Sequence, residues 1–142
     1  MNRRNLRAWS LAAAFAALPV HAGELAISDA WSRTTPPGVT VGVAYFTLKN
    51  DTGKPDRLLK ISSPVATKAQ VHRTEILDGI ARMREVAVLH VDAGQTLEFA
   101  PNGMHVMLVG LKQPLVEGKT FEIEMLFELA GPRKVKVAVR KG

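Results

Sequence analysis

The apolar residues of this chain come in short runs that alternate with polar residues and end at turn-forming residues. No segment keeps the helical spacing of 3.6 residues over twelve positions. The pattern predicts strands at 25–31, 39–48, 57–62, 68–77, 80–88, 96–99, 105–111, 120–129 and 134–140. Strands of this length and spacing favour an all-β fold, an antiparallel two-sheet β-sandwich.

Length and composition set the number of domains. A chain of 142 residues with 46% hydrophobic and 23% charged residues is typical of a soluble globular protein with one core. Lys and Arg are scattered and there is a single Tyr, which argues against a nucleic-acid surface. Cysteine is absent, so the sequence offers neither disulfides nor thiol chemistry.

The first 22 residues are typical of a secretory signal peptide. Arg3, Arg4 and Arg7 precede an apolar run at 10–20 that is too short to span a bilayer, and Ala22 suits cleavage before Gly23. We therefore expect residues 23–142 to be the mature domain, exported to the periplasm without a membrane span. Loss of three of the 19 basic residues and none of the 13 acidic ones leaves a net charge of +3.

The last two predicted strands show ordinary sheet packing. Alternation places one set of residues on a core face: Phe121, Ile123, Met125, Phe127 and Leu129. The outward charges of these strands can lie beside each other across a hairpin: Lys134, Lys136 and Arg140 next to Glu122, Glu124 and Glu128. These carboxylates therefore belong to the sheet surface and are not a catalytic set.

The strand at 105–111 differs, because two methionines and a histidine stand in four consecutive positions. His105 and Met107 point to one face of a regular strand, whereas Met104 points to the other and is expected to be structural. Alone, a histidine in an apolar strand is more often a core or edge residue than a metal ligand.

A second His and Met pair lies in a predicted hairpin. Asp78-Gly79 favours a two-residue type I′ turn, which sets Leu77 opposite Ile80, Thr74 opposite Met83 and His72 opposite Glu85. His72 and Met83 are then diagonal neighbours on one face, and long side chains can meet at that separation.

Two histidines and two methionines form a neutral, soft set of potential ligands. Thioethers select Cu(I), whereas zinc favours Cys, His or carboxylates, and a blue-copper centre needs a Cys that the sequence lacks. Packing alone stays an alternative for these four residues. His90, which precedes a turn at 92–94, is expected to be exposed and without a metal.

The spacing of these residues resembles a known family. His72, Met83, His105 and Met107 match the H-x10-M-x21-H-x-M signature of the periplasmic copper chaperones called PCu(A)C, and the segments at 30–38, 44–48 and 101–112 are similar to strands and loops of that family. The resemblance implies a cupredoxin-like fold, these four residues as Cu(I) ligands, and delivery of copper towards the binuclear copper centre of cytochrome c oxidase.

The sequence thus predicts a periplasmic Cu(I) metallochaperone that is monomeric and is not an enzyme. Its acceptor would be the copper subunit of cytochrome c oxidase or a thiol-bearing copper chaperone. Two alternatives remain open: a periplasmic copper store or buffer, and a metal-free β-sandwich that serves as a binding module.

Overall fold

The computed structural model describes residues 23–142, so the predicted signal peptide lies outside the described residues. The structure confirms the all-β prediction, with ten strands in this part of the chain: β1 (Leu25–Arg33), β2 (Val41–Asn50), β3 (Asp56–Ser62), β4 (Ala66–Leu77), β5 (Ile80–Glu85), β6 (Leu89–Val91), β7 (Thr96–Glu98), β8 (Met104–Leu111), β9 (Thr120–Phe127) and β10 (Gly131–Arg140). No helix in the described range is long and apolar enough to cross a lipid bilayer.

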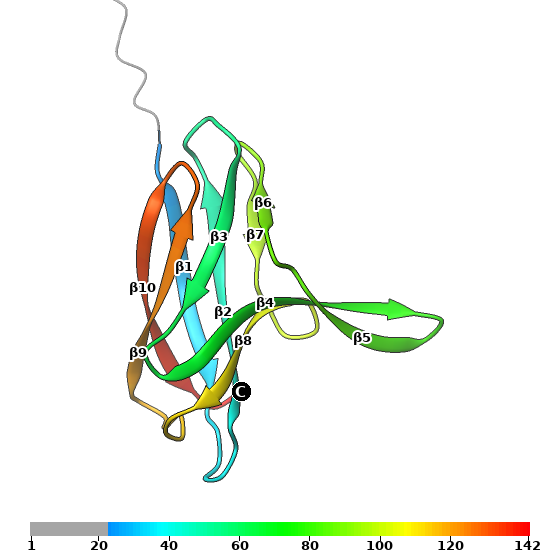
Figure 1. The fold of residues 1–142 in the computed structure, drawn as a ribbon, viewed down its shortest axis with the longest axis vertical. Coiled ribbons are helices and arrows are strands. Elements are labelled where there is room, and N and C mark those ends of the chain that lie inside the picture. The colour runs from blue at the N-terminus through cyan, green and yellow to red at the C-terminus, as the bar shows by residue number, and fades with distance from the viewer. Residues whose placement is uncertain (1–22) are drawn as a thin grey trace, which may run out of the picture.

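The strands form one hydrogen-bonded sheet that curls over its own core (Figure 1). Its order is β5-β4-β8-β2-β1-β10-β9-β3-β6, and β7 pairs with β2 off this path. β3 and β4, which lie near opposite ends of the order, contact each other, so the single sheet makes two layers. One pair departs from the predicted antiparallel arrangement, because β1 runs parallel to β10.

The side chains between the layers form the core. The largest fully buried ones are Phe46, Phe127, Leu48, Leu108, Ile123 and Met125. Strand β9 alternates buried and exposed residues throughout, which confirms Met125 as a core residue. Leu129, in contrast, is 63% exposed, so its predicted core position is wrong. The strand ends at Phe127, and the alternation does not continue into the turn.

The segment after β5 also differs from the prediction. The predicted strand 80–88 is too long, because β5 ends at Glu85. The N–H of Val86 still donates to the Val71 carbonyl, and the chain then leaves the hairpin. Leu89 and Val91 are buried and form the short strand β6, which pairs with β3 and was not predicted. His90, between them, is exposed as expected.

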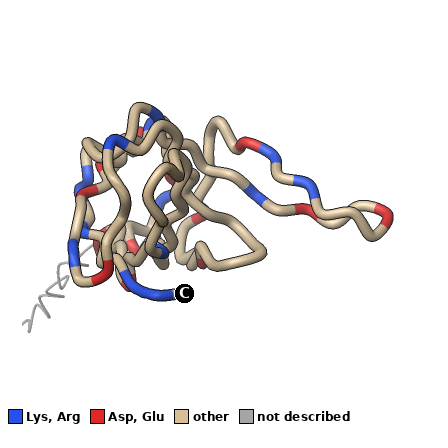
Figure 2. The backbone as a smooth tube through the Cα atoms, turned by 90° about the horizontal axis from the view of Figure 1, so that it is seen from below, with Lys and Arg blue, Asp and Glu red and all other residues tan. Residues whose placement is uncertain are grey.

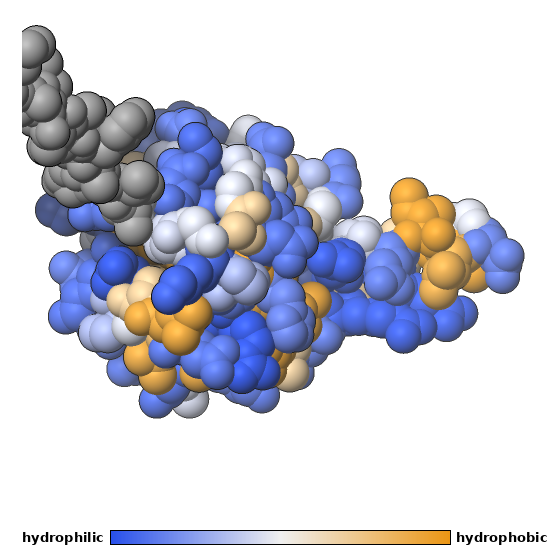
Figure 3. All heavy atoms as spheres, turned by 90° about the horizontal axis from the view of Figure 1, so that it is seen from above, coloured by the Kyte–Doolittle hydropathy of each residue, from blue (hydrophilic) through white to orange (hydrophobic). Residues whose placement is uncertain are grey.

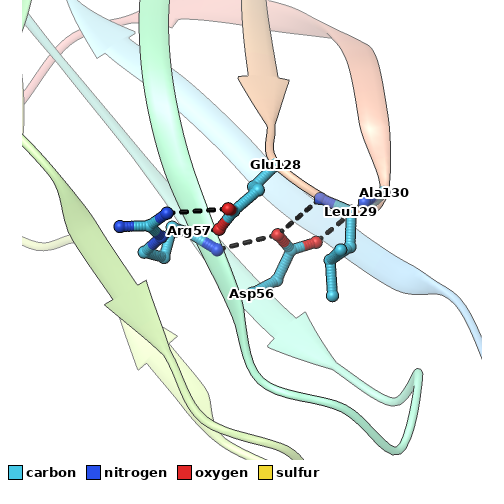
Figure 4. Close-up of polar contacts among 5 residues, drawn as sticks. All are labelled: Asp56, Arg57, Glu128, Leu129 and Ala130. Carbon is cyan, nitrogen blue, oxygen red and sulfur yellow. Dashed lines mark hydrogen bonds and ion pairs between the residues drawn. The ribbon is translucent and has the colours of Figure 1, made fainter.

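Asp56 joins the start of β3 to the turn between β9 and β10 (Figure 4). Its buried carboxylate accepts hydrogen bonds from the backbone N–H groups of Arg57, Leu129 and Ala130 at 2.7, 2.9 and 2.9 Å. Burial raises the pKa of Asp56, but the backbone hydrogen bonds outweigh burial and hold this pKa below its ordinary value. Beside it, Arg57 forms a two-point ion pair with Glu128.

The hairpin of β4 and β5 projects from the body of the molecule as an arm (Figure 1). β4 pairs with β8 over Ala66–Arg73 and with β5 over His72–Leu77, so only its first part belongs to the body. Asp78 and Gly79 have φ values of 52° and 75°, as a type I′ turn requires. The predicted register is confirmed: His72 pairs with Glu85, Thr74 with Met83 and Leu77 with Ile80.

Charged residues are spread over the body and along the arm without a stripe of one sign (Figure 2). Lys134 and Glu124 form an ion pair across β10 and β9 at 3.2 Å, as the sequence predicts for this hairpin, and Arg84 pairs with Glu75 on the arm at 3.3 Å. Both pairs are exposed, so each contributes little to stability.

Candidate metal centre

Two histidines face each other where the arm leaves the body. His72 of β4 and His105 of β8 are register partners, and their ring centroids are 5.8 Å apart. His105 is only 4% exposed and His72 is half-buried. Residues directly opposite on antiparallel strands point to the same face. Strand pairing alone therefore brings these two imidazoles together.

Met107 lies on the same face, two residues after His105. The β4–β8 register is continuous from Lys68 to Arg73, and it places Gln70 opposite Met107. His72, His105, Met107 and Gln70 thus form the four corners of a rectangle on two adjacent strands. Its sides are set by strand geometry, with about 5 Å between Cβ atoms across the strands and about 7 Å between Cα atoms along each strand.

Met83 reaches this face from the other side of β4. Met83 lies on β5 and pairs with Thr74 of β4, which makes it the diagonal neighbour of His72, as the sequence predicts. Its side chain is 60% exposed on the arm. The structure therefore puts all four candidate residues on one sheet face, with His72 in the middle strand and Met83 as the most open member.

Each histidine has one ring nitrogen that is bonded and one that is not. Nδ1 of His105 lies 3.2 Å from the Gly103 carbonyl oxygen, and Nε2 of His72 lies 3.4 Å from Oε1 of Gln70. The two remaining nitrogens, Nδ1 of His72 and Nε2 of His105, are buried without a hydrogen-bond partner. A buried acceptor left without a partner costs about 1–3 kcal/mol, so this pair of lone pairs is suited to a cation.

The surroundings of His72 favour its neutral form. Burial lowers its pKa below the ordinary value of 6.5, and the adjacent His105 and Lys68 lower it further, while Glu85 acts in the opposite direction. A metal ligand must have a free lone pair, so an imidazole that stays neutral at pH 7 is ready to bind.

Met104, the other methionine of β8, lies away from the histidine face. Met104 is 8% exposed and points to the opposite face, where its sulfur is 3.6 Å from Nη2 of Arg73. Its predicted structural role agrees with this position. Among residues 23–142, no three His, Asp or Glu side chains are grouped to hold a metal ion. A metal on the His72 and His105 face would thus depend on the thioethers.

Sequence reasoning missed two groups that support the histidines: the side chain of Gln70 and the carbonyl of Gly103. Gln70 stands two residues before His72, so strand alternation alone could have placed both on one face. The Gly103 contact has no sequence signal, because it arises from the chain path at the entry to β8.

Comparison with known sequences places the chain in a family. Residues 25–139 match the family described as "Putative lipoprotein LpqE-like". A protein of Leifsonia xyli subsp. xyli named "Putative lipoprotein Lxx21020" is 31% identical over 115 residues, which cover 80% of this chain and 68% of the relative.

Two solved structures of similar fold contain copper by their names, and one of them is named a PCuAC domain. The copper-bound PCuAC domain from PmoF2 superposes with a TM-score of 0.71 and 25% identity, covering 85% of this chain and 96% of that domain. The solution structure of CuI-DR1885 from Deinococcus radiodurans gives a TM-score of 0.67 and 32% identity, over 92% of this chain and 84% of that one. The resemblance read from the sequence is confirmed: the chain belongs to the LpqE-like family and has the cupredoxin-like β fold of PCuAC domains.

Proposed function

We propose that this protein is a periplasmic Cu(I) metallochaperone that holds one ion with His72, Met83, His105 and Met107. One observation carries the proposal: two buried imidazole nitrogens without hydrogen-bond partners share a sheet face with two thioethers. The copper-bound PCuAC domain and CuI-DR1885, both similar in fold and sequence, support it.

The chemistry of this set favours Cu(I) over other metals. Thioethers are soft ligands that select Cu(I), and the set has neither the thiolates nor the carboxylates that zinc commonly uses. All four groups are uncharged, so a bound monovalent ion keeps its positive charge. Because the ligands do not neutralise the ion, the site is compatible with an ion that is later released.

The exposure of Met83 supports a carrier. His105 is almost fully buried, whereas Met83 is 60% exposed on the projecting arm. An incoming soft ligand can therefore replace Met83 while the histidines still hold the ion. We infer that transfer proceeds by such stepwise replacement and needs no free copper in solution.

Location and acceptor follow from the N-terminal sequence and from the family resemblance. The signal-like residues 1–22 favour export, in agreement with the lipoprotein name of the Leifsonia relative. We propose that the copper passes to the binuclear centre of cytochrome c oxidase, directly or through a thiol-bearing chaperone, and that the protein acts as a monomer without catalytic activity.

X-ray absorption of the Cu(I)-loaded protein tests the ligand set. We expect one copper per chain, two sulfur and two nitrogen scatterers, and loss of one sulfur in Met107→Leu. Failure to bind Cu(I) would favour the metal-free binding module instead. Binding with nitrogen or oxygen scatterers alone would remove the methionines from the site.

A further inference from the structure

Gln70 occupies the one corner of the rectangle that is not a candidate ligand. It pairs with Met107 across the strands, stands two residues before His72 on β4, and is half-buried. Its Oε1 is the only hydrogen-bond partner of the His72 ring among the described residues, at 3.4 Å from Nε2. A hard amide oxygen suits Cu(I) poorly, so another role has to be considered.

This hydrogen bond decides which nitrogen of His72 has a free lone pair. A neutral imidazole carries one N–H and one acceptor nitrogen, and the amide oxygen of Gln70 can only accept. With Oε1 of Gln70 as the acceptor, we assign the N–H to Nε2, which leaves the lone pair on Nδ1, the buried atom without a partner. At His105 the arrangement is reversed, since Nδ1 donates to the Gly103 carbonyl and Nε2 is free.

Building on the proposed function, we propose that Gln70 is a positioning residue that fixes the His72 ring so that copper binds Nδ1 of His72 and Nε2 of His105. Partners of this kind set the tautomer and orientation of metal-bound histidines, and their loss typically lowers metal affinity 10- to 100-fold. The two histidines therefore differ in their hydrogen-bond partners. The partner of His72 is a side chain that can be replaced, whereas the partner of His105 is a backbone carbonyl.

Nitrogen NMR of the imidazole rings tests this directly in the apo and Cu(I)-loaded protein, which is diamagnetic, at pH 8. In the apo wild type we expect a protonated Nε2 at His72 and a protonated Nδ1 at His105. Loading with Cu(I) should shift Nδ1 of His72 and Nε2 of His105. The opposite nitrogen at His72 would overturn the inference.

Variants separate positioning from general damage. Gln70→Ala should release the His72 Nε2–H to rapid exchange with water and lower Cu(I) affinity at least tenfold, while the His105 signals stay in place. Gln70→Glu keeps an acceptor oxygen and should restore both readouts. Gln113→Ala, the same substitution at an exposed residue after β8, is the matched control and should change neither.

The outcomes distinguish this inference from the proposed function. A wild type that binds no Cu(I) overturns both. A wild type that binds Cu(I), together with a Gln70→Ala variant of unchanged affinity and unchanged His72 signals, overturns the role of Gln70 alone. Equal loss of affinity in Gln70→Ala and Gln70→Glu with unchanged ring signals would also overturn it.

Discussion

His72 and His105 lie directly opposite each other on β4 and β8, with ring centroids 5.8 Å apart. The alignment depends on strand register, because a slip of one residue would turn every side chain of a strand to the other face. Such a slip in β8 would exchange the candidate ligand Met107 for core residues such as Val106, which is fully buried. The core therefore holds the site in register.

The two methionines of β8 should differ sharply in function although they are three residues apart. Met107 lies on the histidine face, whereas Met104 is buried on the opposite face next to Arg73. Met107→Leu should lower Cu(I) affinity at least tenfold, and Met104→Leu should leave it unchanged at a stability cost below about 1.5 kcal/mol. Competition with a chromogenic Cu(I) chelator measures the affinity; equal effects of the two changes would contradict the assignment.

Met83 offers a second pair of matched variants. Its side chain is largely exposed, so Met83→Leu should change the free energy of unfolding by less than about 0.5 kcal/mol while it weakens Cu(I) binding. Met125→Leu changes a core residue that is 2% exposed, and it should retain full Cu(I) affinity. Urea unfolding and chelator competition on both variants measure the two quantities. Unchanged Cu(I) affinity in Met83→Leu would show that Met83 is not a copper ligand.

The pH dependence of the site follows from the lowered pKa of His72. Burial, His105 and Lys68 lower this pKa below 6.5, so copper should be retained to a more acidic pH than a free imidazole would allow. Below the folded-state pKa, protons compete with copper and its affinity should fall. A Cu(I) competition titration from pH 7.5 to 5 measures this, and a flat profile would argue against ligation by His72.

The same shift affects the stability of the apo protein. Because the folded state binds a proton at His72 less readily than the unfolded chain does, stability should decrease as pH falls through and below 6.5. His72→Gln should reduce this dependence in urea unfolding at pH 7.5 and 5. An identical pH dependence in the wild type and the variant would show that His72 does not contribute to it.

Much of this site was predictable from sequence because strand periodicity and turn chemistry act locally. Asp78-Gly79 fixed the hairpin register, and alternation put His105 and Met107 on one face. Two features could not be predicted, because they depend on contacts distant in sequence. The short strand β6 forms by pairing with β3, and β1 pairs with β10 in the parallel direction. The exposure of Leu129 was not predictable for the same reason. Asp56 accepts hydrogen bonds from the backbone of Leu129 and Ala130, so these residues form a turn and do not continue the strand.

Asp56 should be important for stability and unimportant for copper. Asp56→Ala removes the acceptor of three backbone N–H groups. Because these donors are then left without a partner, we expect the free energy of unfolding to fall by at least about 2 kcal/mol. Since its pKa is lowered in the folded state, this stabilisation is present above the unfolded-state pKa and is lost as pH falls through the folded-state value. Glu128→Gln, which breaks the exposed ion pair with Arg57, is the control and should have a much smaller effect on urea unfolding.

Copper transfer should be faster than spontaneous release, because the arm offers the ligands to a partner. Ile76, Leu77 and Ile80 are 74%, 43% and 56% exposed at the arm's outer end, beside Met83, and apolar residues gather there on the surface (Figure 3). An acceptor that approaches this end can supply a soft ligand in place of Met83 before the histidines release the ion. Transfer then passes through a shared intermediate, and its rate should rise with acceptor concentration.

Stopped-flow mixing of the Cu(I)-loaded protein with a copper-free oxidase copper domain measures this rate. The control is a chelator that binds only free Cu(I), which reports the unassisted release rate. Met83→Leu removes the ligand that we expect to leave first, so the variant should release copper faster to the chelator and depend less on acceptor concentration. A wild-type rate equal to unassisted release at every acceptor concentration would contradict stepwise handover, and a copper store or buffer would then explain the site better.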